Sequence, residues 1–138
     1  GDQGRFEQSG YTECSECNLA NADLRNLRYV DNVRVDLYWA NLSGANLSGA
    51  NLNIAGLRRA DLSGADLSGA NLTRADLSGA DLSGANLTRA DLSGAYLIGA
   101  NLTDADLTDA DLAGANLKYV IGADFTGAKN VPAKYLKN

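Results

Sequence analysis

The sequence predicts an all-β fold in which the chain winds into a coil of short extended segments. From Val35 to Tyr119 one five-residue pattern, A-(D/N)-L-(S/T)-G, is repeated 17 times without a break, with Leu at the centre of every unit. On an α-helix, successive Leu residues would turn by about 140° and form no stripe. On a straight strand they would point to opposite faces. Three extended residues followed by a two-residue corner satisfy the pattern and predict a β-helix or solenoid.

Each position of the repeated unit has a predicted environment. The Leu and the Ala two residues before it share one side of the extended segment and are expected to fill the core. The Asp or Asn between them is expected to face water. The Ser or Thr and the Gly after the Leu are turn residues and are placed at the corner. Leu and Ala make up most of the 45% apolar content, so the core should be narrow and continuous.

The segment from Ala60 to Leu72, ADLSGADLSGANL, resembles the pentapeptide-repeat family. The resemblance implies a right-handed, four-sided parallel β-helix of tandem pentapeptide repeats, with four units per coil. Four units are 20 residues of this pattern. An alternative is open, because the segment from Asn71 to Ala80 recurs at Asn86 to Ala95, and a spacing of 15 residues fits three units per coil. We expect four sides.

The chain is expected to form a single domain over residues 1–138, with repeat coils over 13–128. The segment from Gly1 to Thr12 lacks the five-residue pattern and is predicted to be an N-terminal cap, with Phe6 and Tyr11 available to cover the open end of the core. Residues 129–138 are predicted to form a short C-terminal capping helix. In that helix Asn130 is the expected N-cap and Pro132 lies in the first turn. Its apolar residues, Val131, Tyr135 and Leu136, are expected to lie over the last coil.

The register of the pattern slips twice, near residues 25–36 and 118–124. Leu24 and Leu37 belong to phases displaced by three residues, and Leu117 is followed eight residues later by Phe125. A bulge or a longer corner would absorb each slip. A loop that binds a ligand is the alternative for the first.

Cys14 and Cys17 both fall on inward positions when the pattern is extended backward from Leu19. A disulfide across one corner and a pair of buried free thiols are both open. Zinc binding is less favoured because zinc needs four ligands and the chain has no His. Redox catalysis is also less favoured, because the sequence lacks the βαβ context of thioredoxin-like C-x-x-C motifs.

The sequence argues against an enzyme. Catalysis needs groups that converge in a pocket, whereas the inward positions here are Leu and Ala and the carboxylates lie outside. No cofactor or metal is expected, because single outward Asp residues supply too few ligands for an ion. No apolar run approaches the roughly 18 residues of a membrane span, so no membrane insertion is expected.

The predicted function is a non-enzymatic structural or protein-interaction module with an unknown protein partner, present as a monomer or weak homodimer. The sequence has no Met, even at position 1, so we expect that an export signal or a tag preceded Gly1. Cyanobacterial and chloroplast members of the family that it resembles are often lumenal. These points favour export to a thylakoid lumen or periplasm, with a cytoplasmic location as the alternative.

An alternative function is mimicry of DNA, because some members of the family it resembles are acidic rods that bind the topoisomerase gyrase. The net charge of −5 weakens this interpretation. A rod of about 25 Å would replace duplex DNA carrying about 15 phosphate charges. Four arginines also interrupt the acidic surface: Arg58, Arg59, Arg74 and Arg89. Direct binding to nucleic acid is not expected.

A candidate binding face emerges when the chain is folded at 20 residues per coil. The units centred on Leu37, Leu57, Leu77, Leu97 and Leu117 then share one side, and most bulky departures from the pattern fall there. These residues are Tyr38, Trp39, Arg58, Arg59, Tyr96, Ile98, Lys118 and Tyr119. Aromatic residues beside arginines are typical of protein-binding surfaces. Two alternatives are open: terminal segments or loops cover Tyr38, Trp39 and Tyr119, or the departures are sequence drift.

Overall fold

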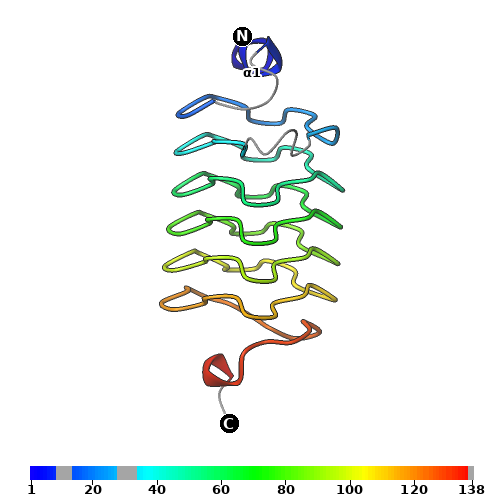
Figure 1. The fold of residues 1–138 in the computed structure, drawn as a ribbon, viewed down its shortest axis with the longest axis vertical. Coiled ribbons are helices and arrows are strands. Elements are labelled where there is room, and N and C mark those ends of the chain that lie inside the picture. The colour runs from blue at the N-terminus through cyan, green and yellow to red at the C-terminus, as the bar shows by residue number, and fades with distance from the viewer. Residues whose placement is uncertain (9–13, 28–33, 137–138) are drawn as a thin grey trace.

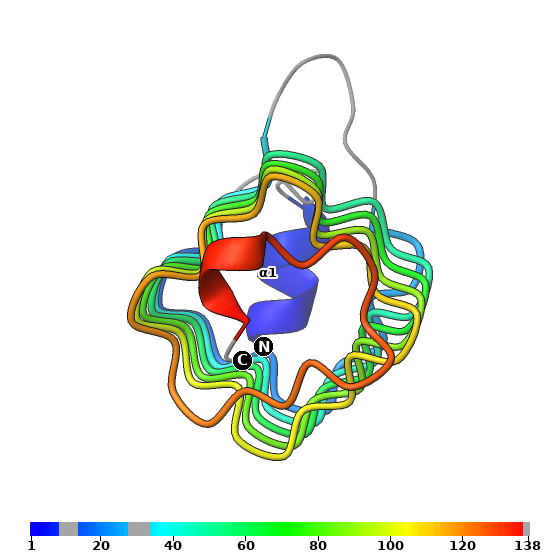
Figure 2. The ribbon, with the colours of Figure 1, turned by 90° about the horizontal axis from the view of Figure 1, so that it is seen from below.

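The computed structural model describes residues 1–8, 14–27 and 34–136 and shows a stack of coils with a helix at each end (Figure 1). The described elements are one α-helix, α1 (Asp2–Gln8), and one 3-10 helix, η1 (Ala133–Tyr135). The coils are joined by isolated parallel β-bridges in place of longer strands. Viewed end on, the coils superimpose on a four-lobed outline, and the two helices lie over its centre (Figure 2).

The bridges show that each regular coil contains 20 residues. Bridged partners keep this spacing from Asp36 and Gly56 to Asn101 and Ile121. Four five-residue units, and hence four sides, therefore make one coil, and the alternative of three units is wrong. The backbone carries this register: the Leu77 N–H donates to the Tyr96 carbonyl (2.7 Å), one coil further along the chain.

The interior is a column of Leu and Ala, as the period of the pattern predicts. Every Leu from Leu37 to Leu117 is at most 2% exposed, and the alternating Ala residues are at most 7% exposed. No buried polar or charged residue is found among the described residues. The extended segments place Leu and Ala on the same inward side because side chains alternate along an extended chain.

Each corner is a β-turn closed by a backbone hydrogen bond from the Ala to the Leu three residues before it. At one such corner the Ala80 N–H donates to the Leu77 carbonyl (3.0 Å). The residue two after the Leu has a φ between 55° and 70° in all the regular coils. This left-handed conformation explains why Gly is the preferred residue there.

The Asp and Asn residues have a structural role that the sequence analysis missed. Their side chains bend back over the corner instead of simply facing water. The Asp81 Oδ1 accepts both the backbone N–H (2.9 Å) and the hydroxyl (2.6 Å) of Ser83. Asn41 and Ser43 form the same pair of bonds, at 3.0 and 2.6 Å. Such side chains replace a backbone acceptor and hold the turn closed.

The N-terminal end is closed by α1. Phe6 is fully buried and belongs to the same core cluster as the Leu column. The Asp2 carboxylate accepts the Asn18 N–H (2.6 Å), which ties the start of α1 to the first coil. Cys14 and Cys17 form a disulfide inside this coil. Tyr11, the other predicted capping residue, lies outside the described residues.

The two changes of register are visible in the bridge spacing. Asn18 bridges Asn41, a spacing of 23 residues, so three extra residues lie between the first two coils. They fall between Leu27 and Arg34, where residues 28–33 lie outside the described residues. Near the other end Asp111 bridges Lys129, a spacing of 18, so the last coil is shorter by two residues.

The C-terminal segment differs from the predicted capping helix. Within residues 129–136 the helical turn is η1, which follows Pro132 and has no side-chain cap. The prediction that Asn130 is the N-cap was wrong, because this residue has a left-handed φ of 58° and its amide donates to the Asp111 Oδ1 (3.0 Å). An N-cap residue normally has an extended backbone. Tyr135 packs against the core, but Leu136 is 51% exposed, contrary to prediction.

The buried column predicts a large difference between inward and outward substitutions. Leu77→Ala should lower the free energy of unfolding by about 2–5 kcal/mol, because it leaves a cavity in a core that cannot collapse. Ser83→Ala removes one half-buried hydroxyl bond while its backbone N–H bond to Asp81 is retained. It should cost about 1 kcal/mol or less. Urea unfolding measures both, and equal losses would contradict the inward assignment of Leu77.

The corner hydrogen bonds also predict a titration effect at Asp106. The Thr108 hydroxyl, and then the Thr108 backbone N–H, hold the pKa of this carboxyl below its usual value. Thr108→Val should therefore raise the pKa of Asp106 toward the usual value while the backbone bond preserves part of the shift. An NMR titration of the Asp106 carboxyl carbon measures the change. Thr88→Val is the matched control, because Thr88 donates to Asn86, which does not titrate.

The sign of the pH dependence follows from the same bonds. A carboxyl whose pKa is lower in the folded state contributes stability that is present above the unfolded pKa, and that is lost as the pH falls through the folded pKa. The pKa of Asp106, Asp111 and Asp124 is lowered by hydrogen bonds from Thr108, Asn130 and Thr126 respectively. The free energy of unfolding should therefore decrease as the pH falls below about 4, and stability that does not change in this range would contradict the assignment.

Candidate functional site

The structure places all eight predicted site residues on one side of the rod, which we call the aromatic face. It is defined by Tyr38, Trp39, Arg58, Arg59, Tyr96, Ile98, Lys118 and Tyr119. Backbone bonds fix their order along the axis: the Trp39 N–H donates to the Arg58 carbonyl (3.1 Å) and the Gly79 N–H to the Ile98 carbonyl (2.9 Å). The Gly99 N–H in turn donates to the Lys118 carbonyl (2.9 Å). The face therefore spans five successive coils.

The large side chains of this face are open to solvent. Trp39 is 55% exposed, Tyr96 50%, Ile98 37% and Tyr119 73%. Arg58, Arg59 and Lys118 are also exposed, and Tyr38 is half-buried. The structure thus differs from the alternative in which Trp39 and Tyr119 are covered by terminal segments or loops. Large exposed apolar residues gathered on one surface are typical of an interaction site.

Three residues of the aromatic face occupy the corner position that favours Gly. Trp39, Arg59 and Tyr119 have φ values of 59°, 58° and 63°. A side chain in this left-handed region costs about 1 kcal/mol or more relative to Gly. On the other sides the non-Gly corners of the regular coils carry Ile54, Arg74, Arg89, Asp104 and Asp109, and no aromatic residue. The aromatic residues at strained corners are therefore confined to this face.

The electrostatics of the face are set by its cations. The Arg59 guanidinium lies 5.1 Å from the centre of the Trp39 ring, and the Lys118 ammonium 5.0 Å from that of Tyr119. The Arg58 Nε lies 3.8 Å from the Asp76 Oδ2. Cation–π pairs of exposed groups contribute about 0.5–1 kcal/mol each. These contacts hold the guanidinium groups against the surface without covering them.

Sequence reasoning missed Arg34, which reaches onto the aromatic face. Its guanidinium lies over Gly56, where an added Cβ would be 2.9 Å from the Arg34 Nη2. The same Nη2 lies 3.9 Å from the Asp36 carboxylate. In two of the repeated units the residue before the central Leu is neither Asp nor Asn, and these residues are Gly56 and Tyr96. The sequence signal that could have revealed the position of Arg34 was Gly56, because the absence of a side chain there leaves room for a neighbouring one. The face therefore carries one more arginine than predicted.

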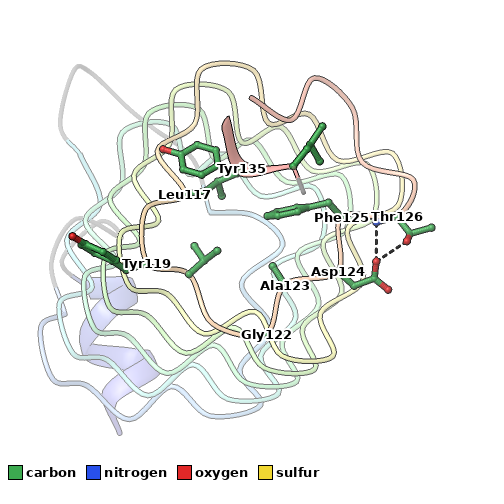
Figure 3. Close-up of a pocket in the computed structure, with 10 residues that line it drawn as sticks. Leu117, Tyr119, Gly122, Ala123, Asp124, Phe125, Thr126 and Tyr135 are labelled. Carbon is green, nitrogen blue, oxygen red and sulfur yellow. Dashed lines mark hydrogen bonds between the residues drawn. The ribbon is translucent and has the colours of Figure 1, made fainter. Parts of the chain in front are cut away.

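A second candidate site is the open C-terminal end of the core, which the sequence analysis also missed. The shortened last coil leaves a cavity of about 750 Å³, whose lining includes Leu117, Phe125 and Tyr135 (Figure 3). The Asp124 Oδ1 accepts the Thr126 hydroxyl (2.6 Å), and the pKa of this carboxyl is lowered mainly by that bond. Figure 3 shows Asp124 pointing away from the centre of the coil. The cavity is thus lined by both polar and apolar groups, and among the described residues it brings no catalytic groups together.

Two further properties bear on function. Within residues 1–8, 14–27 and 34–136, no three His, Cys, Asp or Glu side chains are grouped closely enough to hold a metal ion. Neither of the described helices has the length and apolar character that a membrane crossing requires.

Comparison with known proteins identifies the family. The family described as pentapeptide repeats matches residues 33–69, 55–94 and 85–129, with 8 copies of its repeat. The chain belongs to the pentapeptide-repeat family, whose members form right-handed, four-sided β-helices. A comparison with curated proteins finds no match.

Solved structures of cyanobacterial pentapeptide-repeat proteins are similar to this chain. HetL from Nostoc sp. strain PCC 7120, a protein involved in heterocyst differentiation regulation, is 44% identical over 79% of this chain and 46% of its own, with a TM-score of 0.56. This chain therefore spans less than half the length of HetL. Rfr23 from Cyanothece 51142 is 34% identical over 94% of this chain and 95% of its own (TM-score 0.62). The protein alr5209 from Nostoc PCC 7120 is 41% identical over 69% of this chain and 84% of its own (TM-score 0.55).

The strained corners predict that two residues of the aromatic face contribute little to stability. Trp39→Gly and Tyr119→Gly should each change the free energy of unfolding by less than about 1 kcal/mol, because the relief of left-handed strain offsets the lost cation–π contact. Thermal and urea unfolding measure the effect. A loss above about 2 kcal/mol would show that these rings are packing residues.

The matched control is Gly49→Ala. Gly49 has a φ of 67° and nothing lies within 4 Å of an added Cβ. This substitution therefore reports backbone strain without a steric clash, and should lower the free energy of unfolding by about 1 kcal/mol. An unchanged stability would show that the corner imposes no strain on a side chain.

Proposed function

We propose that this protein is a non-enzymatic interaction module whose aromatic face binds a partner protein. The single observation that carries the proposal is the exposure of Trp39 and Tyr119 at corner positions where Gly would be less strained. Departures from the locally favoured residue are expected at functional sites. Aromatic rings flanked by arginines are the residue types that contribute most energy to protein interfaces.

The design of the rod supports this role. A solenoid displays its outward residues on a regular, rigid surface, and such surfaces are used for extended binding. The inward column is fully occupied by Leu and Ala, so variation that does not disturb the fold is confined to outward positions. The aromatic face is where that variation is concentrated.

The proposal is tested by photo-crosslinking from the face itself. p-Benzoylphenylalanine replaces Tyr96, and Asn86 in a control; both positions are exposed, and both precede a core Leu, but they lie on different sides. Irradiation in cells that express the protein should give a discrete adduct from position 96 and none from position 86. The adduct should decrease at least tenfold when Trp39→Gly and Tyr119→Gly are added.

Three outcomes would contradict the proposal. These are adducts of equal yield from both positions, an adduct unaffected by the two Gly substitutions, and the absence of any adduct from position 96. Dose-dependent inhibition of gyrase supercoiling by micromolar protein would favour the alternative of DNA mimicry.

We further propose an exported location, in a thylakoid lumen or a periplasm. The support is the disulfide between Cys14 and Cys17, because disulfides persist in oxidising compartments and are rare where thiols are kept reduced. Acid quenching of intact cells followed by alkylation under denaturing conditions measures the redox state. Both cysteines should be modified only after reduction, and full modification without a reductant would contradict export.

A further inference from the structure

We infer that the segment bound by the aromatic face is acidic, with a carboxylate at Arg58 and Arg59 and an apolar side chain beside Ile98. This inference rests on the proposed function and adds the chemistry of the partner. It starts from a shallow hollow of about 590 Å³ in the middle of the face. The hollow is lined by Arg58, Arg59, Ser78, Gly79, Ile98 and Gly99.

The hollow exists because one coil of the face keeps the consensus while its neighbours do not. Ser78 and Gly79 are small, and they lie between the arginines of one coil and Ile98 of the next. Gly79 gives the Arg59 stem room here, because an added Cβ would lie 3.2 Å from the Arg59 Cγ. The Arg59 stem therefore rests over Gly79 while its guanidinium reaches back to Trp39. A depression bordered by two cations and an aliphatic residue results.

Both guanidinium groups have donors to offer. Arg58 has one long ion pair, to Asp76 at 3.8 Å. Arg59 contacts the Trp39 ring, and in the part of the chain that the structure describes it has no carboxylate within ion-pair distance. Each arginine carries five N–H donors in a planar fork that matches a carboxylate with two parallel bonds. The border of the hollow is thus suited to a carboxylate.

The negative charge of the other sides of the molecule would direct an acidic segment to the hollow and away from the rest of the surface. The protein has a net charge of −5 and its other sides carry rows of Asp, so they repel an acidic partner. A nucleic acid is less suitable, because its backbone requires a continuous basic track. Here Asp36 and Asp76 interrupt the cations.

The spacing of the coils limits the sequence of the partner segment. The Arg58 and Ile98 levels are separated by two coils, which is about 10 Å at about 4.8 Å per coil. A peptide in the extended polyproline II conformation advances about 3.1 Å per residue and turns every third side chain to the same side. The acidic residue and the apolar residue of the partner should therefore be about three positions apart.

The test uses a fluorescent peptide with a glutamate and, three positions later, a leucine, repeated over about nine residues. Fluorescence polarisation should show saturable binding to the full chain, weakened at least tenfold by Arg58→Gln with Arg59→Gln. The matched control combines Arg74→Gln and Arg89→Gln, whose arginines occupy equivalent left-handed corners on other sides. This control should change the dissociation constant by less than twofold.

The inference is overturned by any of four results. They are absence of binding, equal binding of a peptide with glutamine in place of glutamate, equal weakening by the control variant, and tighter binding of a thymidine oligonucleotide with the same arginine dependence. If position 96 gives a face-specific crosslink and any of these four results is found, the proposed interaction module is retained and only the acidic chemistry of its partner is rejected. Absence of the crosslink would instead contradict the proposed function, whether or not the peptide binds.

Discussion

The backbone hydrogen bonds between successive coils are the interaction on which the structure depends. From Leu37 to Leu102, each core Leu donates its N–H to a carbonyl of the next coil, as Leu77 does to Tyr96. A constant coil length keeps these bonds in one register, because a single residue inserted into an extended segment would turn Leu outward. Where the length does change, the structure is irregular, at the 23-residue and 18-residue spacings near the two ends. Variation in the middle of the rod is therefore restricted to side chains that point outward.

The corners decide which outward positions can vary without loss of the fold. A regular corner uses two devices, a residue with positive φ and an Asp or Asn oxygen that accepts the backbone N–H two residues later. In several units of the aromatic face the residue that usually provides one or both devices is replaced. Trp39, Arg59 and Tyr119 replace Gly, and Gly56 and Tyr96 replace the Asp or Asn. Departures from locally consistent choices are expected at functional sites, and here the aromatic departures coincide on one side of the rod.

The two ends of the rod close in different ways. At the N-terminus α1 inserts Phe6 into the core, above a coil that contains the Cys14–Cys17 disulfide. At the C-terminus the last coil is shorter, η1 contributes a single turn, and a cavity remains beside Phe125 and Tyr135 (Figure 3). The ends of a solenoid cannot pair their backbone or bury their core with a further repeat, so they require such irregular solutions.

The period of the sequence by itself determined the inside and the outside of the coils. At 20 residues per coil, spacing along the chain converts directly into position in space and makes Trp39 and Arg59 neighbours. Only the tertiary structure decided between 15 and 20 residues per coil, because that choice depends on which backbones pair. It also decided the bent side chains of Asp81 and its equivalents, the reach of Arg34 over Gly56, and the short turn at Ala133–Tyr135 in place of a helix. The last two features depend on a contact between coils or on a segment where the repeat is broken, and no local pattern encodes them, whereas the Asp81 side chain bonds to Ser83 within its own corner.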